Sequence, residues 1–344
     1  IMRSFFGPFT LSVMVDEIKT RKDIALVSRS KLVLALTVYT NLRVQRIYEA
    51  ISKEIGNTDS SNKALIYSYW MFEPALVAIG LKRKLKYGRA ISRAHGYDVY
   101  KERHINSYIP FRKNVFEEIE SIYSISESGR NYLCSEFNGQ YVSKIELSRL
   151  GTEKKYPDYN EINESRGITI VSCAYLVPLK RVHLIAEALK LSTKDVTWIH
   201  FGDGDLLEDL KKKVKELPSN IKVFLMGSVY NEEIQKFYST HYIDAFINVS
   251  ETEGIPVSIM EAQSYGIPVI ATDVGGTSEL VVNGENGILL AKDFNAGDLL
   301  VALDTVIANG NKFRKHAKTT WLEKSSAEKN YREFFDCEIE RLNG

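Results

Sequence analysis

Two glutamates, Glu253 and Glu261, carry the strongest signal for chemistry in this 344-residue sequence. They lie in the segment 248–262, NVSETEGIPVSIMEA, where we expect a strand to end near Ser250 and a helix to begin near Pro256. Free N–H groups at the start of a helix bind anions, and a carboxylate accepts paired hydrogen bonds from the vicinal hydroxyls of a sugar. The segment therefore predicts a site for a ligand that contains both phosphate and sugar.

Two cations follow another predicted strand, 168–173. Lys180 and Arg181 come just after Pro178, where a helix is expected to begin. A cation at this place can neutralise the charge that develops on a leaving phosphate group. The alternative interpretation is that Lys180 is a solvated residue of the first helical turn.

The elements that must position these residues follow a regular order from about residue 64 onward. Short β-rich runs alternate with amphipathic helical runs, which predicts an α/β fold with parallel sheets and helices on both faces. We expect strands at 64–70, 89–94, 122–125, 144–148, 168–173, 196–201, 221–226, 245–249, 268–272 and 287–290.

The polar segment 151–166, GTEKKYPDYNEINESR, lacks an apolar period and is predicted to be a linker. It separates a Rossmann-like domain over 1–150 from a second, doubly wound one over 167–325. The charged amphipathic segment 326–344 is predicted to be a helix that returns to the first domain. Because ligands of such folds bind at the carboxyl ends of the strands, we expect the two domains to face a cleft.

Composition and charge exclude several classes of protein. The sequence is 44% hydrophobic and 26% charged, which argues against disorder and coiled coil. The net charge of +1 combines +8 over residues 1–150 with −7 over the remainder, which disfavours a nucleic-acid binder. Three scattered cysteines form no zinc or disulfide pattern and suit a reducing compartment. No apolar run near the start is long enough to span a bilayer, so we expect a cytoplasmic protein.

The segment 248–262 resembles the signature of the retaining family-4 glycosyltransferases, which have the GT-B fold. That signature is Glu-x7-Glu in the form E-G-x-P-x-x-x-x-E-A, and Glu253 and Glu261 stand at its two glutamates. The text over 266–290, GIPVIATDVGGTSELVVNGENGILL, is also similar to that family. The resemblance covers roughly 64–343 and looks closest to bacterial enzymes that build surface polysaccharide. It implies that the second domain binds a nucleotide-sugar and the first binds the acceptor.

The resemblance also implies roles for single residues. Glu253 would contact the transferred sugar, Glu261 would bind the ribose, and Lys180 would compensate the charge of the diphosphate. Tyr175 stands where the family usually has Arg, and Arg181 replaces a Gly, so we expect Arg181 to supply the second phosphate cation. The other expected donor-binding residues are Gly254, Ile255, Pro256, Val257, Gly202, Gly204, Met226, Gly227 and Ser228.

The motif Asp203-x-Asp205 has two interpretations. It looks like the metal site of the other large glycosyltransferase fold, but it lies between a predicted strand and a predicted helix. Gly202 and Gly204 match the Gly-x-Gly turn that the GT-B family places beside the nucleotide, and this match favours the turn. We therefore expect no metal and no cofactor; the nucleotide-sugar, with UDP or GDP as its carrier, is a substrate.

In the first domain, His95 follows a predicted strand in the segment 92–98, SRAHGYD. The family often has His-Gly-x-Asp here, and the resemblance puts His95 near the transferred sugar and the acceptor, with Asp98 holding the loop. Without the resemblance, a lone His is more often structural. Arg103 and Arg112 are expected to line the acceptor side.

The basic run 81–89, LKRKLKYGR, belongs to the positively charged first half. It predicts contact with an anionic membrane or with a lipid-diphosphate acceptor. The alternative is a solvated helix end whose cations suit the helix dipole. With the resemblance, we expect a lipid-linked saccharide acceptor at the inner face of the cytoplasmic membrane.

The predicted reaction is transfer of a sugar with retention at the anomeric carbon. The alternatives are an epimerase or phosphorylase of the same fold, and a non-catalytic remnant that binds nucleotide-sugar. We identify neither an epimerase's acidic set nor a pyridoxal lysine motif. The family normally begins with a short strand and a Gly-rich loop, which would precede Ile1, so we expect a fragment with an incomplete first domain.

Overall fold

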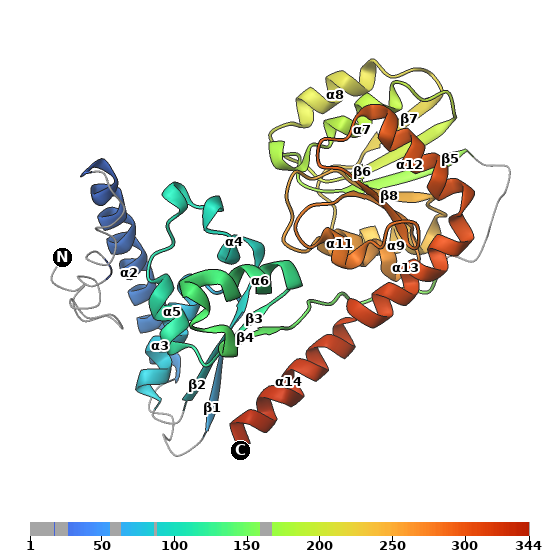
Figure 1. Cartoon of the computed structure of the whole chain (residues 1–344). Helices are drawn as coiled ribbons and strands as arrows, with labels where there is room; N and C mark the ends of the chain where they lie inside the picture. Colours follow the sequence, from blue (N-terminus) through green and yellow to red (C-terminus); the bar gives the residue numbers. More distant parts are fainter. Residues whose placement is uncertain (1–16, 18–26, 56–62, 86–87, 159–166, 344) are drawn as a thin grey trace. The chain divides into compact units, whose positions relative to one another are not determined.

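The chain divides into two compact units (Figure 1). Unit 1 comprises Ile1–Ser148 and Phe334–Gly344, and unit 2 comprises Arg149–Glu333. The computed structural model describes residues 17, 27–55, 63–85, 88–158 and 167–343. The expectation that the first domain lacks its first strand falls largely on residues 1–16, 18–26 and 56–62, which lie outside the described part of the chain.

Unit 1 is built on a parallel four-stranded sheet in the order β1-β2-β3-β4. Its side-chain core lies between this sheet and the helices, and it includes Leu76, Ile79, Phe116 and Ile122. Because all strands run the same way, their carboxyl ends lie at one edge of the sheet. The strands are Ala64–Ser68 (β1), Gly88–Ala94 (β2), Ser121–Ser124 (β3) and Ile145–Leu147 (β4).

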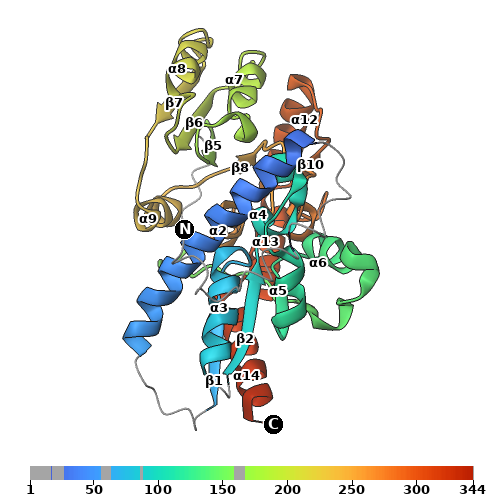
Figure 2. The same ribbon diagram turned by 90° about the vertical axis from the view of Figure 1, so that its left-hand side faces the viewer.

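Helices connect and cover the strands of unit 1. α3 (Glu73–Lys84) follows β1 and has a proline in its first turn, where the missing N–H costs no helical hydrogen bond. α5 (Arg112–Glu118) precedes β3, and α6 (Glu127–Ser135) follows it. The 29-residue α2 (Val27–Ile55) packs against α3 (Figure 2).

The last residues of the chain complete unit 1. Phe334 of α14 (Ala327–Asn343) is 4% exposed and packs edge-on against the ring of Tyr123. The fully buried carboxylate of Glu338 accepts a hydrogen bond of 3.0 Å from Arg89 Nε and another from the Tyr123 hydroxyl. A buried carboxylate is tolerated only when it is paired, so these contacts fix the end of α14 to β2 and β3.

Unit 2 is built on a parallel six-stranded sheet in the order β10-β9-β8-β5-β6-β7. The first strand, β5, pairs with β6 on one side and β8 on the other. The chain order reverses between β5 and β8, which is where doubly wound folds bind ligands. The strands are Ile168–Cys173 (β5), Val196–Phe201 (β6), Ile221–Leu225 (β7), Ala245–Asn248 (β8), Val269–Thr272 (β9) and Gly287–Leu290 (β10).

Helices also alternate with the strands of unit 2, and apolar side chains from both bury its core. The helices are α7 (His183–Leu189), α8 (Leu207–Lys215), α9 (Asn231–Thr240), α10 (Val257–Ser264), α11 (Thr277–Leu280), α12 (Ala296–Ala308) and α13 (Gly310–Lys324). Each of the ten predicted strands has its counterpart, and the predicted α/β fold class is confirmed.

The described part of the predicted linker, residues 151–158, is bound to the rest of the chain by hydrogen bonds. Trp321 Nε1 donates a hydrogen bond of 2.8 Å to Thr152 Oγ1, and the Lys155 N–H donates one of 3.1 Å to Gln235 Oε1. Residues 151–158 therefore lie on unit 2. The polar sequence of this segment does not predict its attachment, because the contacts are made mainly by backbone and hydroxyl groups.

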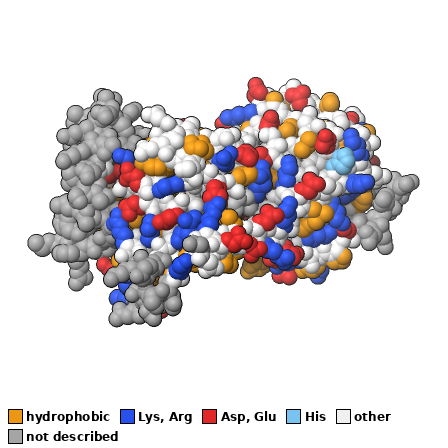
Figure 3. All heavy atoms as spheres, turned by 60° about the horizontal axis from the view of Figure 1, so that its bottom comes forward, with side chains coloured by type: hydrophobic (Ala, Val, Ile, Leu, Met, Phe, Trp, Pro, Cys, Tyr) orange, Lys and Arg blue, Asp and Glu red, His pale blue; other side chains and the backbone are white. Residues whose placement is uncertain are grey.

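Several cations of the predicted basic run pair with acidic side chains. Lys82 pairs with Glu120, and Arg83 pairs with Glu118. Figure 3 shows Lys and Arg side chains interspersed with Asp and Glu side chains over one face of the molecule. Among the residues described, no helix has both the length and the apolar character that crossing a bilayer requires.

We expect Glu338→Ala to lower the free energy of unfolding by about 3 kcal/mol, because it leaves Arg89 half-buried without its anion. Chemical denaturation followed by circular dichroism measures this change. The matched control is Glu340→Ala, an exposed glutamate on the same helix. Equal effects of the two substitutions would show that the buried pair does not hold α14.

Candidate functional site

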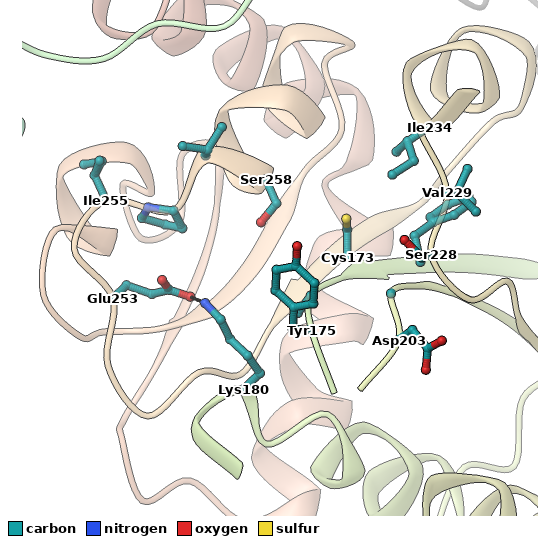
Figure 4. A pocket seen from close by; sticks show the side chains of 15 residues that line it. Cys173, Tyr175, Lys180, Asp203, Ser228, Val229, Ile234, Glu253, Ile255 and Ser258 are labelled. Carbon is teal, nitrogen blue, oxygen red and sulfur yellow. Dashed lines mark hydrogen bonds and ion pairs between the residues drawn. The ribbon is translucent and has the colours of Figure 1, made fainter. Parts of the chain in front are cut away.

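A cavity of about 350 Å³ opens at the carboxyl edge of the unit 2 sheet (Figure 4). It lies where the strand order reverses, so strands and loops that are distant in sequence contribute to it. Its lining comes from the ends of β5 and β6, the loop before α9 and the start of α10: Cys173, Ala174, Tyr175, Lys180, Phe201, Gly202, Asp203, Ser228, Val229, Ile234, Glu253, Ile255, Pro256, Val257 and Ser258.

Glu253 and Lys180 meet in this cavity. Lys180 Nζ donates a hydrogen bond of 2.6 Å to Glu253 Oε1 (Figure 4). Asn248 Nδ2 donates one of 3.2 Å to the same oxygen. Glu253 is 8% exposed, and a buried carboxylate is tolerated when it is paired in this way. The two residues predicted to contact sugar and diphosphate thus form one ion pair, and each sets the other's position.

The start of α10 also faces the cavity. Pro256 occupies the cap position, Val257 is the first helical residue, and both line the cavity together with Ser258. The first N–H groups of a helix have no partner inside the helix and carry the positive end of its dipole. This end of the cavity therefore favours an anionic group.

The Gly-x-Gly turn after β6 needs glycine at Gly202 because the backbone that follows β5 lies close to it. Gly202 has φ 141°, and a Cβ there would lie 1.9 Å from the Ala174 carbonyl oxygen. Asp203 Oδ1 accepts a hydrogen bond from the Gly204 N–H, so it helps to shape the turn. Asp203 lines the cavity and Asp205 does not. In the described part of the chain, no group of three or more His, Cys, Asp or Glu side chains could hold a metal ion.

Arg181 does not take the position predicted for a phosphate cation. Its guanidinium donates to the carbonyl oxygens of Val249, Ser250 and Lys292 at 2.9, 3.2 and 2.8 Å, and the side chain does not line the cavity. It ties the end of β8 to the loop after β10. Arg181 also has φ 47°, in the left-handed region that glycine adopts most easily, which accounts for the Gly that the family has here.

Glu261 lies one turn further along α10 and does not line the cavity. Its Oε1 accepts a hydrogen bond of 2.6 Å from Asn231 Nδ2. Burial raises the pKa of Glu261, and the Asn231 hydrogen bond opposes this shift. Of the other predicted donor-binding residues, the cavity is lined by Gly202, Ile255, Pro256, Val257 and Ser228, but not by Gly204, Gly254, Met226 or Gly227.

His95 lies at the carboxyl edge of the unit 1 sheet, directly after β2, and caps the short helix α4 (Gly96–Val99). The rings of Tyr69 and Trp70 lie 4.7 and 4.2 Å from its ring, centroid to centroid. Burial and the positive charge of Arg93 lower the pKa of His95 to about 4, so the imidazole is neutral near pH 7. Its predicted proximity to the transferred sugar stays a prediction.

Asp98 holds the His95 loop, because its Oδ2 accepts a hydrogen bond of 3.0 Å from the His95 N–H. Burial raises the pKa of Asp98 to about 6. Arg112, predicted to meet the acceptor, is 5% exposed; it pairs with Glu136 at 2.8 Å and donates to the Asp98 and Val99 carbonyls. Its donors therefore hold the fold of unit 1. Arg103 lies with its guanidinium 4.8 Å from the Tyr100 ring centroid.

Several residues at the cavity were not predicted. Cys173 is the last residue of β5 and Tyr175 comes two residues later, and their place at a strand end was a usable signal. Burial raises the pKa of the Cys173 thiol to about 12, so it is protonated and not a nucleophile. Ser258 lies in the first turn of α10, beside the predicted residues. Ile234 reaches the cavity from α9, and no sequence signal indicates that contact.

Solved structures of glycosyltransferases share this fold. The structure of HepE of Anabaena in complex with UDP and glucose matches with a TM-score of 0.69, covering 87% of this chain and 82% of that chain at 16% identity. At this identity the likeness shows the fold alone. The chain has the GT-B fold of glycosyltransferases.

Residues 155–320, which lie in unit 2, match the family model "Glycosyl transferases group 1". Over 139 residues the chain is 33% identical to the O-antigen biosynthesis glycosyltransferase WbnH of Escherichia coli, covering 40% of this chain and 37% of that protein. Over 120 residues it is 32% identical to the UDP-Gal:alpha-D-GlcNAc-diphosphoundecaprenol alpha-1,3-galactosyltransferase of Escherichia coli, covering 33% of this chain and 30% of that protein. The match thus spans about a third of the length of each of these relatives.

We expect His95 to contribute a fall in the free energy of unfolding as the pH drops from about 6.5 towards 4, because the unfolded state binds a proton at this histidine before the folded state does. His95→Gln should reduce this fall by about 2 kcal/mol. Denaturation of both proteins at pH 7.0 and 5.0 measures the difference. The matched control is His241→Gln at an exposed histidine, and an unchanged pH dependence in His95→Gln would contradict the neutral buried imidazole.

Proposed function

We propose that the protein is a retaining, metal-independent glycosyltransferase that moves a sugar from a nucleotide-sugar to a saccharide acceptor in bacterial polysaccharide synthesis. One observation carries the proposal: the Lys180–Glu253 ion pair lies beside the first turn of α10, in a cavity of the group 1 glycosyltransferase domain. This arrangement supplies a cation and helix N–H groups for a diphosphate, and a carboxylate for sugar hydroxyls.

In the proposed reaction, Lys180 and the first N–H groups of α10 stabilise the charge that develops on the leaving nucleoside diphosphate. When a phosphate oxygen attracts Lys180, Glu253 is released to accept hydrogen bonds from the transferred sugar. Glu261 binds the ribose. The acceptor hydroxyl attacks the anomeric carbon on the face that the diphosphate leaves, and a diphosphate oxygen takes its proton, so the configuration is retained without a covalent enzyme intermediate.

The donor is proposed to be a UDP- or GDP-sugar, and the HepE complex with UDP and glucose supports UDP. The acceptor is proposed to be a lipid-linked saccharide, in line with the diphosphoundecaprenol named for one relative. Unit 1 would bind it, with His95 shaping the reaction site. We place the protein in the cytoplasm, at the inner membrane face. The basic run 81–89 stays the candidate for this membrane contact, with Lys82 and Arg83 also paired to Glu120 and Glu118.

Calorimetric titration with UDP, GDP and ADP, with and without EDTA, tests the donor site. We expect one nucleotide to bind in both buffers. Lys180→Ala and Glu261→Ala should each weaken its binding ~10-fold or more, because each removes a charged hydrogen-bond partner.

The matched control is Glu251→Ala, an exposed glutamate two residues before Glu253 that pairs only loosely with Lys292 at 3.3 Å. It should bind like the unsubstituted protein. Binding that EDTA abolishes would contradict metal independence, and a failure of all three nucleotides to bind would contradict the donor site itself. Turnover of the bound nucleotide's sugar conjugate with a lipid-linked saccharide then tests transfer.

A further inference from the structure

A continuous chain of hydrogen bonds leads from the backbone of residue 155 to Glu261. The Lys155 N–H donates to Gln235 Oε1 at 3.1 Å, and Gln235 Nε2 donates to Asn231 Oδ1 at 2.8 Å. Asn231 Nδ2 then donates to Glu261 Oε1 at 2.6 Å. Gln235 and Asn231 are one turn apart on α9, so the helix itself sets their spacing.

The direction of this chain is fixed at both ends. A backbone N–H can only donate, and an ionised carboxylate can only accept. Gln235 must therefore present its oxygen to Lys155 and its NH₂ to Asn231, and Asn231 must present its NH₂ to Glu261. The Tyr265 hydroxyl also donates to Gln235 Oε1, at 3.0 Å, which strengthens the same orientation. Gln235 is 3% exposed. Exchanging the positions of its amide oxygen and nitrogen would leave buried polar groups without hydrogen bonds.

Glu261 depends on this donor because its other neighbours give little support to a carboxylate. The titratable groups that face it are the protonated thiol of Cys173 and the hydroxyl of the fully buried Tyr238. In the described part of the chain no second side chain donates to it. The terminal torsion of a Glu side chain is broad, so a single fixed hydrogen bond decides how the carboxylate plane lies.

We infer that Asn231, held by Gln235, is a positioning residue that aligns the Glu261 carboxylate with both hydroxyls of the donor's ribose. The inference rests on the proposed function, in which Glu261 binds that ribose. It makes Asn231 a determinant of the preference for a ribonucleotide over its 2′-deoxy counterpart. A site arranged for a hydroxyl rejects the analogue that lacks it, because its polar group is left unpaired.

The test uses whichever of UDP, GDP and ADP the protein binds. It compares the dissociation constant of that nucleotide with the dissociation constant of its 2′-deoxy form. The unsubstituted 344-residue chain should prefer the ribonucleotide by ~10-fold or more. Asn231→Ala should bring this ratio close to one. Asn231→Asp keeps the size of the side chain but faces Glu261 with a like charge, so it should also lose the preference and bind the ribonucleotide more weakly still.

The matched control is Glu233→Ala, an exposed residue in the first turn of the same helix, which should keep the full preference. Equal weakening of both nucleotides in Asn231→Ala, with the ratio kept, would mean a merely structural role and would overturn the inference alone. A protein that binds a nucleotide but ignores the 2′-hydroxyl would overturn the ribose role of Glu261 as well. Binding of none of the three would overturn the proposed function and the inference with it.

Discussion

The parallel pairing of β5 with both β6 and β8 is the constraint on which the candidate site depends. It places the carboxyl ends of three strands next to one another and leaves a crevice where the order reverses. Lys180 follows one of these strands and Glu253 follows another, 73 residues later. The ion pair between them exists because the sheet topology brings those strand ends together, and the cavity lies around it.

Unit 2 uses its polar side chains in two distinct ways around this crevice. Arg181 donates its hydrogen bonds to backbone carbonyls. Asn248, Asn231 and Gln235 donate theirs to other side chains. Asn248 donates to Glu253 and Asn231 donates to Glu261, so each of these carboxylates has a fixed hydrogen-bond donor beside it. Such support matters because a charged group acts strongly only when it is already in place before the ligand arrives.

Strand positions and the place of Glu253 at the cavity were predictable because their signals are local: a β-rich run that ends in Gly, Asp or Ser, and a glutamate in the loop between a strand and a helix. The Gly-x-Gly turn was predictable for the same reason, since the clash that excludes a Cβ at Gly202 lies in the neighbouring strand end. The position of Arg181 was not predictable from the sequence. A sequence shows that an arginine is near a strand end, but not that three carbonyl oxygens compete for it. Gln235 and Ile234 were not predicted because only the packing of α9 brings them to the site. The attachment of residues 151–158 to unit 2 was not predicted because backbone groups make it.

The division of α14 between the units has a consequence for synthesis of the chain. Unit 1 buries Phe334 and Glu338, which come after every residue of unit 2 in the sequence. During translation, the ribosome therefore releases the strands of unit 1 long before the residues that fill the gap beside β2 and β3. Unit 2 is contiguous and can finish folding first. Until α14 emerges, Tyr123 and Arg89 lack their contacts with Phe334 and Glu338 on the nascent chain.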